Sequence, residues 1–194
     1  IITVVSVLIG FVLGIILALM RLGHNKLLHG LAVAYIEFIR GTPLMVQVMF
    51  VYFGIGAVIQ SLPALAAGII AVSLNSGAYV AEVIRSGIES IAIGQTEAAR
   101  SLGMSQKQTY QYVVIPQAIK NIWPALGNEF ITLIKESSIV SVIGVGDLMY
   151  QTQLVQSATY KGVAPLAITM VIYFVLTFTL SKGLNYFEGK MKHE

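Results

Sequence analysis

Cysteine is absent from this chain of 194 residues, and charged residues are scarce. Without cysteine the chain has no disulfide framework, no cysteine-ligated metal and no thiol nucleophile. Charged residues make up 11% of the sequence, well below the ~25% that is usual in soluble domains, while hydrophobic residues reach 56%. This composition excludes a soluble enzyme, a disordered chain and a disulfide-stabilised scaffold.

The few charges are clustered, which leaves residues 1–20, 41–81 and 162–181 without any. A helix needs about 20 mostly apolar residues to cross a bilayer, so each stretch is long enough for one or two crossings. We therefore predict an all-α, multi-pass membrane protein. Because the first stretch lacks a basic start and a small-residue cleavage site, it predicts a membrane helix rather than a signal peptide. Residue 1 is Ile, so we expect the natural start to lie upstream.

Five membrane spans account for this pattern. The stretch from residue 41 to 81 is too long for one crossing, and Ser61-Leu62-Pro63 interrupts it, so it predicts a helical hairpin. In order, the predicted spans are Ile1–Met20, a helix from residue 41 to about Gln60, a helix from about Ala64, a more polar helix from about Ala118 to Ser137-Ser138, and Val163–Ser181.

Basic residues predict how the spans are oriented, because Lys and Arg collect on cytoplasmic loops. With the N-terminus outside and the C-terminus inside, only Lys135 and Lys161 remain outside. The cytoplasmic side then receives Arg21, Lys26, Arg40, Arg85, Arg100, Lys107, Lys120, Lys182, Lys190 and Lys192. This orientation makes Arg85–Lys120 a long cytoplasmic loop, the only sizeable part of the chain outside the membrane.

The cytoplasmic loop predicts two short helices joined by a glycine turn. Thr96 is suited to cap the N-terminus of the first helix, and Glu97 would interact favourably with the positive end of the helix dipole. Gly103 is suited to end this helix in a left-handed conformation. Ser105 and Gln108 form a capping box at the start of the second helix, and Pro116 marks the entry to the next span. Such an exposed pair of helices suits a docking element. The alternatives are an ordinary structured loop and a DNA-binding helix-turn-helix, which the membrane spans on both sides disfavour.

The loop sequence resembles the EAA loop of ABC-importer permeases. Glu97-Ala98-Ala99 is followed after three residues by Gly103, and after nine more by Val113-Val114-Ile115-Pro116, where the family pattern has Ile and Leu at the positions of Val113 and Ile115. Further stretches are similar to the polar amino acid permeases and extend the resemblance from about Arg21 to Lys192. These stretches are Glu37-Phe38-Ile39-Arg40-Gly41-Thr42-Pro43, Tyr79-Val80-Ala81-Glu82-Val83-Ile84-Arg85-Ser86-Gly87-Ile88 and Pro116-Gln117-Ala118.

The resemblance implies a type I (MetI-like) importer permease, with residues 1–194 as one transmembrane domain and a coupling loop at about 86–117. It implies a second permease subunit, identical or paralogous, a cytoplasmic ATPase dimer and an external amino acid-binding protein, all at a prokaryotic inner membrane. The residues implied to contact the ATPase are Glu97, Ala98, Ala99, Arg100 and Gly103. The chain has no G-x-x-x-x-G-K-[ST] loop, so we expect no cofactor and no catalytic activity in it. ATP and Mg²⁺ would be bound by the partner.

Polar residues inside the predicted spans mark a candidate substrate site, because such residues are costly in a bilayer. The candidates are Asn75, Ser76 and Glu82 on the third span, and Asn128, Glu129 and Thr132 on the fourth. An alternative role for Glu82 is an ion pair with Arg85, three residues on. The fourth span either lines a water-filled path or packs against a second subunit. Gln47 joins the path or forms an interhelical hydrogen bond.

Glu129 has no basic residue three or four positions away, and an unpaired carboxylate in mid-membrane favours a cationic substrate. We therefore expect arginine, lysine or histidine, with glutamine as the alternative.

Pro43 is interpreted as a helix start, with Glu37 and Arg40 at the cytoplasmic boundary and not assigned to substrate. Gly144-Val145-Gly146-Asp147 is interpreted as an external turn: an intramembrane aspartyl protease needs two Asp residues, and Asp147 is the only one.

Two other functional classes remain possible from the residues alone. A self-contained channel or secondary transporter explains the intramembrane polar groups but gives no reason for the docking loop, and the inverted repeats common in such transporters are not evident. A scaffold subunit of a membrane complex explains the loop but not the polar fourth span.

Overall fold

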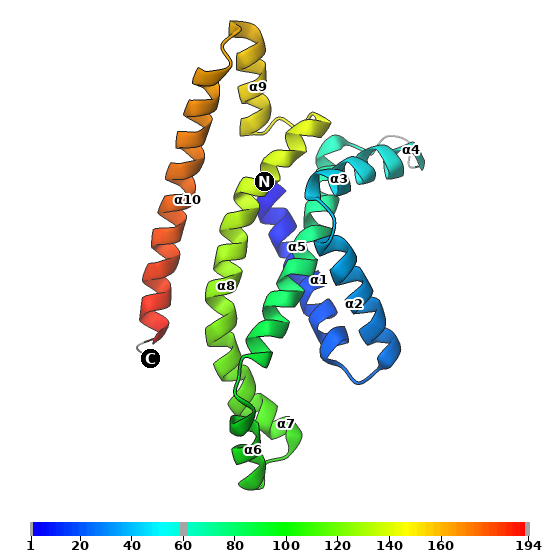
Figure 1. Ribbon diagram of the computed structural model, residues 1–194, viewed down its shortest axis with the longest axis vertical. Coiled ribbons are helices and arrows are strands. Elements are labelled where there is room, and N and C mark those ends of the chain that lie inside the picture. Colours follow the sequence, from blue (N-terminus) through cyan, green and yellow to red (C-terminus); the bar gives the residue numbers. More distant parts are fainter. Residues whose placement is uncertain (1, 59–61, 193–194) are drawn as a thin grey trace.

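The computed structural model describes residues 2–58 and 62–192, and all regular elements among them are helices (Figure 1). The first half contains α1 (Ile2–Leu22), α2 (Lys26–Arg40), α3 (Leu44–Met49), the π-helical η1 (Phe50–Ile55), α4 (Gly56–Val58) and α5 (Ala64–Glu89). The second half contains α6 (Ile93–Ser101), α7 (Gln106–Thr109), the π-helical η2 (Tyr110–Val114), α8 (Ile115–Glu136), the 3₁₀ segment η3 (Ser137–Ile143), α9 (Leu148–Thr159) and α10 (Val163–Lys192).

By length and composition, three of these helices could cross a membrane: α1, α5 and α10. The pair formed by α2 and Leu44–Val58 could supply a fourth crossing, although a bend of 104° separates its two parts. The helix α8 is long enough but too polar to belong to this group. Each of the five predicted stretches is helical, and α5 begins at Ala64 as expected, but only three or four of the segments among the described residues qualify as membrane spans. Gln60 and Ser61, at the predicted hairpin turn, lie outside the described residues.

The segment before the second span differs from expectation. We predicted a loop at the membrane boundary up to Arg40, but residues 26–40 form α2, which Asn25 caps by accepting hydrogen bonds from the backbone N–H groups of Leu27 and Leu28. Its buried side chains, Ala32 and Ile36, pack with residues of α1 and α5. Arg40 is therefore the last residue of a helix that packs on α1 and α5, and it is exposed.

Glycines bring α1 and α5 into close contact. A Cβ atom added to Gly10 would lie 2.6 Å from Cβ of Ser76, and one added to Gly14 would lie 2.5 Å from Cγ1 of Val80. No side chain larger than hydrogen fits at either position. Gly10 and Gly14 therefore form a small-residue packing pair between the two helices.

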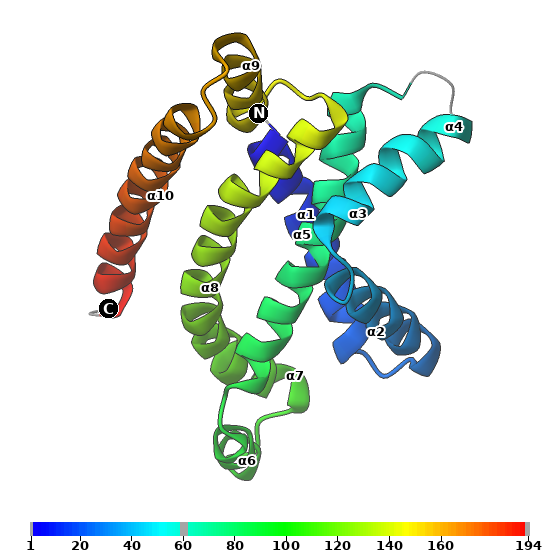
Figure 2. The same ribbon diagram turned by 45° about the horizontal axis from the view of Figure 1, so that its top comes forward.

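The helix α8 joins the bundle to α10 through two further close approaches. Gly87 of α5 faces Ile122 of α8, and Gly127 of α8 faces Leu184 of α10. Pro124 lies inside α8, which is visibly curved in Figure 2. Most of α10 is exposed along its apolar length, so much of its surface is available to lipid or to another subunit.

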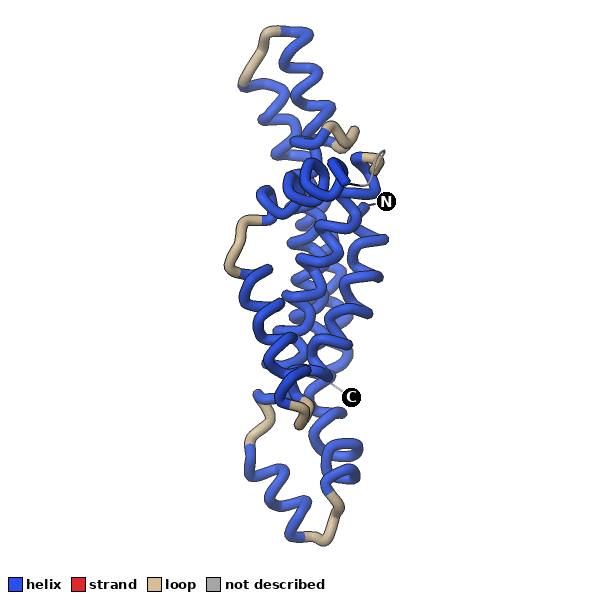
Figure 3. The backbone as a smooth tube through the Cα atoms, turned by 90° about the vertical axis from the view of Figure 1, so that its right-hand side faces the viewer, coloured by secondary structure: helices blue, strands red, loops and turns tan. Residues whose placement is uncertain are grey.

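The molecule is elongated, and a helical hairpin extends from each end (Figure 3). One hairpin consists of α6 and α7. At the other end, Gly144 adopts a left-handed conformation (φ 81°), which confirms the predicted turn at 144–147. Asp147 then caps α9 by accepting a hydrogen bond from the Tyr150 N–H. We had not predicted α9, which packs on α10 through a hydrogen bond between Thr152 and Thr169.

Candidate coupling and substrate sites

The helix α6 lies beyond the ends of the long helices, at one end of the molecule (Figure 1). The prediction that Thr96 caps this helix is wrong, because α6 begins one turn earlier, at Ile93, with Ala92 at the cap position. The N–H of Gln95 donates to the carbonyl oxygen of Ala92, so the first turn closes without a side-chain cap. Thr96 is therefore an internal, half-buried residue of α6.

The end of α6 agrees with prediction. Gly103 has φ +85°, its N–H donates to the Arg100 carbonyl oxygen, and the Met104 N–H donates to that of Ala99. These two bonds form the Schellman motif that fixes where a helix ends. Ser105 and Gln108 form the predicted capping box at the start of α7. The glycine turn thereby sets the direction of α6 relative to α7.

The structure separates the alanine pair that the sequence suggested would form one flat face. Ala99 is 5% exposed and packs inside the α6–α7 hairpin, whereas Ala98 is exposed beside Glu97. Arg100 is also exposed, and its Nη1 donates to the carbonyl oxygen of Met104 at 3.0 Å. Ile93 (76% exposed) and Leu102 (84% exposed) place uncovered apolar side chains at the two ends of α6.

Amide groups link α5 to the corner between α2 and α3. Nδ2 of Asn75 donates to Oε1 of Gln47 at 3.0 Å. Nε2 of Gln47 donates in turn to the Ile39 carbonyl oxygen (2.7 Å) and to Oγ1 of Thr42 (2.8 Å). Gln47 therefore forms the interhelical bond considered above. The neighbouring Ser76 faces Gly10 of α1 instead, and its buried hydroxyl has no partner among the described residues.

The Glu82 carboxylate is the centre of an ion-pair cluster near the α6 end of the bundle. It accepts hydrogen bonds from Nη1 of Arg21 at 2.9 Å and from Nε of Arg85 at 3.1 Å. Nη1 of Arg40 lies 3.8 Å away, too far for a hydrogen bond. Arg85 also pairs with Glu89. The ion pair of Glu82 with Arg85 that we considered as an alternative is thus present. It belongs to a larger cluster than the predicted pair, because the cluster joins α1, α2 and α5.

The polar residues of α8 lie apart from the α5 group. Asn128 is exposed, and Glu129 and Thr132 are half-buried. Among the described residues, no hydrogen bond joins these three side chains to Asn75, Ser76 or Glu82, and Glu129 takes part in no ion pair.

Arg40 is a candidate that the sequence analysis left out. Its guanidinium stands 5.4 Å from the ring centre of Tyr79 and makes no hydrogen bond among the described residues. Its side chain is 34% exposed and lies 3.8 Å from Glu82, so it is a charged group beside a candidate site residue. The buried positions of α2, Ala32, Ile36 and Ile39, follow helical spacing and were the signal that could have placed Arg40 on a helix packed against the bundle.

Comparison with known proteins gives consistent results. Residues 10–193 match the protein family described as "Binding-protein-dependent transport system inner membrane component". The chain is 41% identical over 190 residues to the probable glutamine ABC transporter permease protein GlnM of Bacillus subtilis, covering 98% of this chain and 88% of that protein. It is 44% identical over 192 residues to the arginine transport system permease protein ArtQ of the same organism, with the same coverage.

Solved structures show the same fold. A chain described as "Crystal structure of an amino acid ABC transporter with histidines" superposes with a TM-score of 0.93 at 51% identity, covering 97% of this chain and 88% of that one. An inward-facing MetNI methionine ABC transporter superposes with a TM-score of 0.77 at 20% identity, covering 97% and 90%. The second likeness supports the predicted MetI-like fold.

The Glu82 cluster generates a stability prediction. The Glu82→Gln change removes the one carboxylate shared by Arg21, Arg40 and Arg85, which then repel one another. Hydrogen bonds to charged groups contribute about 1.5–3 kcal/mol each. Because Glu82 is 20% exposed, solvent screens part of this effect, and we expect a total loss of roughly 1–3 kcal/mol. Thermal unfolding of the purified chain in detergent measures it.

The matched control is Glu37→Gln, because Glu37 is exposed and takes part in no ion pair among the described residues. We expect this variant to unfold at the temperature of the parent. A Glu82→Gln protein as stable as the Glu37→Gln protein would show that the cluster does not hold the three helices together.

Proposed function

This chain belongs to the family of binding-protein-dependent transport system inner membrane components, as an amino acid permease of the ABC-importer type, and we propose that it imports polar amino acids with energy from ATP. The external binding protein would deliver the substrate, and the chain would pass it inward by alternating access. No reaction is assigned to the chain itself. ATP and Mg²⁺ would bind to a cytoplasmic ATPase dimer, and the site of action would be a prokaryotic inner membrane.

The proposed arrangement has five membrane segments, with the N-terminus outside and the C-terminus inside. The second segment would comprise α2 together with the bent helix at Leu44–Val58. This orientation puts α6 and α7 in the cytoplasm and α9 at the outer surface. Two permease subunits, identical or paralogous, would face each other through the polar side of α8, because that side is unsuited to lipid.

The coupling site would be α6. Its exposed residues Glu97, Ala98 and Arg100 would contact a groove of the ATPase, while Ala99 packs the helix onto its own hairpin. Gly103 would set the angle at which α6 enters that groove. Support comes from the position of α6 beyond the ends of the long helices and from its uncovered apolar residues, Ile93 and Leu102.

A substitution at the glycine turn tests the coupling role. In Gly103→Val, the φ of +85° costs an L-residue about 1–2 kcal/mol, so we expect the end of α6 to change direction. Substrate-stimulated ATP hydrolysis and amino acid uptake should both fall in proteoliposomes that contain the assembled transporter. The control is Gly94→Val, since Gly94 has open space around it and no left-handed conformation.

An assembled Gly103→Val transporter with the hydrolysis and uptake of the parent would refute the coupling role. If hydrolysis and uptake fell in both variants, valine would be harmful at either position of α6. The glycine turn would then have no specific role in coupling.

The proposed substrate site comprises Asn75, Ser76 and Glu82 from α5 and Asn128, Glu129 and Thr132 from α8. The observation that supports it best is Glu129, a half-buried carboxylate with no ion-pair partner among the described residues. A cationic side chain would supply that partner, so arginine, lysine and histidine are the first candidates. Glu82 and Ser76 would join the site only if the arginines around Glu82 or the contact with α1 rearrange during transport.

Glutamine is the second candidate substrate. The amide groups of Asn75 and Gln47 can bind a side-chain amide, which both donates and accepts hydrogen bonds. The relatives include both substrates: one is named as a probable glutamine permease and another as an arginine permease. The charge at position 129 should therefore decide between them.

Uptake of arginine and glutamine, measured side by side, tests this site. If Glu129 binds the cationic side chain, Glu129→Gln loses a charge-assisted interaction of about 1.5–3 kcal/mol. Arginine uptake should then fall about tenfold or more while glutamine uptake changes little. Glu136→Gln, two turns further along α8, is the control that should retain both activities.

Arginine uptake equal to that of the parent in both Glu129→Gln and Glu82→Gln would place the site elsewhere. A similar loss for arginine and glutamine would retain the site but remove the preference for a basic substrate.

A further inference from the structure

An apolar groove of about 350 Å³ runs along one side of the bundle between α1, α5 and α8. Its lining includes Phe11, Ile15, Ile84, Ile88, Ile119 and Trp123. Ile88 is one residue from the end of α5 that leads to α6, whereas Phe11 lies in the middle of α1. The groove therefore extends from the α6 end of the bundle toward its mid-depth.

The groove lies on the side of α8 opposite to Asn128 and Thr132, whereas Glu129, seven positions after the lining residue Ile122, shares the side of the groove. Nine positions separate Ile119 from Asn128, and nine separate Trp123 from Thr132, which is about two and a half turns at 3.6 residues per turn. A second permease chain that covers Asn128 and Thr132 would thus leave the groove uncovered. In a chain that spans a bilayer, the apolar material that remains to fill it is lipid.

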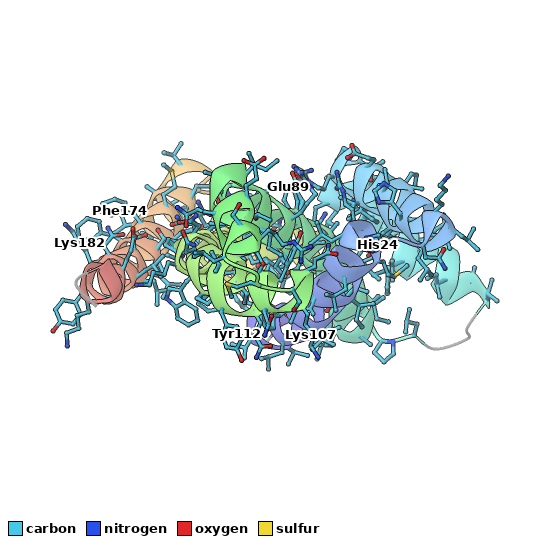
Figure 4. The ribbon with its side chains drawn as sticks, turned by 90° about the horizontal axis from the view of Figure 1, so that it is seen from below. His24, Glu89, Lys107, Tyr112, Phe174 and Lys182 are labelled. Atoms are coloured by element: carbon cyan, nitrogen blue, oxygen red, sulfur yellow. The ribbon has the colours of Figure 1, made fainter. Side chains whose placement is uncertain are left out.

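Two lysines lie close in the sequence to the α8 residues that line this groove, at the α6 end of that helix. Lys120 follows the lining residue Ile119 and precedes Trp123 by three positions, and Lys107 belongs to α7, which continues through η2 into α8. Both lysines are exposed, and neither forms an ion pair among the described residues. Figure 4 shows the molecule from the α6 end, with Lys107 and Tyr112 at the edge along which α1 runs.

We propose that the groove binds one anionic phospholipid from the leaflet on the α6 side. An acyl chain would lie between α1, α5 and α8, and the phosphate would contact Lys107 and Lys120. The Tyr112 hydroxyl and the Trp123 indole N–H supply further hydrogen-bond donors of the kind found at membrane interfaces. A zwitterionic lipid would fill the same groove but would gain less from the two lysines, so the site should select for negative charge.

The only tryptophan of the chain makes this proposal directly measurable, because Trp123 lines the groove and is 50% exposed. Bromine atoms on lipid acyl chains quench tryptophan fluorescence on contact. The full chain would be reconstituted without partner subunits into phosphatidylcholine vesicles. Increasing fractions of dibrominated phosphatidylglycerol or dibrominated phosphatidylcholine would then be compared.

We expect the anionic lipid to reach half-maximal quenching at a mole fraction at least fivefold lower than the zwitterionic lipid. A lysine near the membrane surface contributes about fivefold to anionic lipid binding, equivalent to ~1 kcal/mol. The double variant Lys107→Gln/Lys120→Gln should bring the two curves together. The control Lys161→Gln/Lys182→Gln removes the same charge elsewhere and should preserve the difference. Should the double variant fail to insert, Lys120→Gln alone should reduce the difference, and so should high salt in the parent.

Three results would overturn the proposal. Equal curves for the two lipids in the parent would mean that the groove contacts bulk lipid without selecting a headgroup. Weak quenching by both would mean that protein, such as a second copy of the chain, covers Trp123. A preference that survives in the variants without Lys107 and Lys120, and at high salt, would exclude these lysines as the phosphate ligands. The measurement involves no transport step, so its failure would leave the proposed function untouched.

Discussion

Hydrocarbon offers no hydrogen-bond partner to a polar group, and the arrangement of this chain follows from that cost. The Glu82 carboxylate receives hydrogen bonds from Arg21 and Arg85, and the side chains of Asn75 and Gln47 bond each other. The bonds of Arg21 to Glu82 and of Asn75 to Gln47 also hold the bundle together, because each joins two different helices, whereas the Arg85–Glu82 bond lies within α5. Glu129 is half-buried and takes part in no ion pair among the described residues, and the proposed substrate preference rests on it.

The same helices that carry the proposed substrate site lead directly into the proposed coupling site. Three residues separate the end of α5 from the start of α6, and α7 continues through η2 into α8 without a break. A displacement of α6 by a partner would therefore act on α5 and α8 together. Within the proposed substrate site, Glu82 lies closer along α5 to α6 than Asn75 does, so its ion-pair cluster would resist or transmit such a displacement.

Local signals in the sequence were sufficient for much of this architecture. The left-handed turn at Gly103 and the capping box of Ser105 and Gln108 depend on residues close together in the chain, and both were predicted correctly. The start of α6 was not, because Thr96 has the chemistry of a cap but backbone bonding from Ala92 closes the first turn earlier. Likewise, α2 was missed because its charges suggested a boundary loop, although its buried face has helical spacing.

The surroundings of the candidate substrate residues were harder to predict, since they depend on contacts between distant segments. Spacing along α5 indicated Arg85 as a partner of Glu82 but could not reveal Arg21 or Arg40, which come from other helices. By contrast, the absence of a basic residue three or four positions from Glu129 agrees with the structure, in which Glu129 takes part in no ion pair among the described residues. The inward turn of Ala99 arises from packing against α7 and η2, and the Glu97-Ala98-Ala99 pattern alone contains no sign of it.

The central claim, that this chain is the membrane part of an ATP-driven importer, has one direct measurement. Uptake of labelled arginine and glutamine would be followed in proteoliposomes that contain the permease, its ATPase subunits and an external binding protein, with ATP enclosed on the ATPase side. Omitting either the ATPase or ATP should abolish accumulation against a gradient. Accumulation by the permease alone, without ATP, would contradict this account and would favour a self-contained transporter.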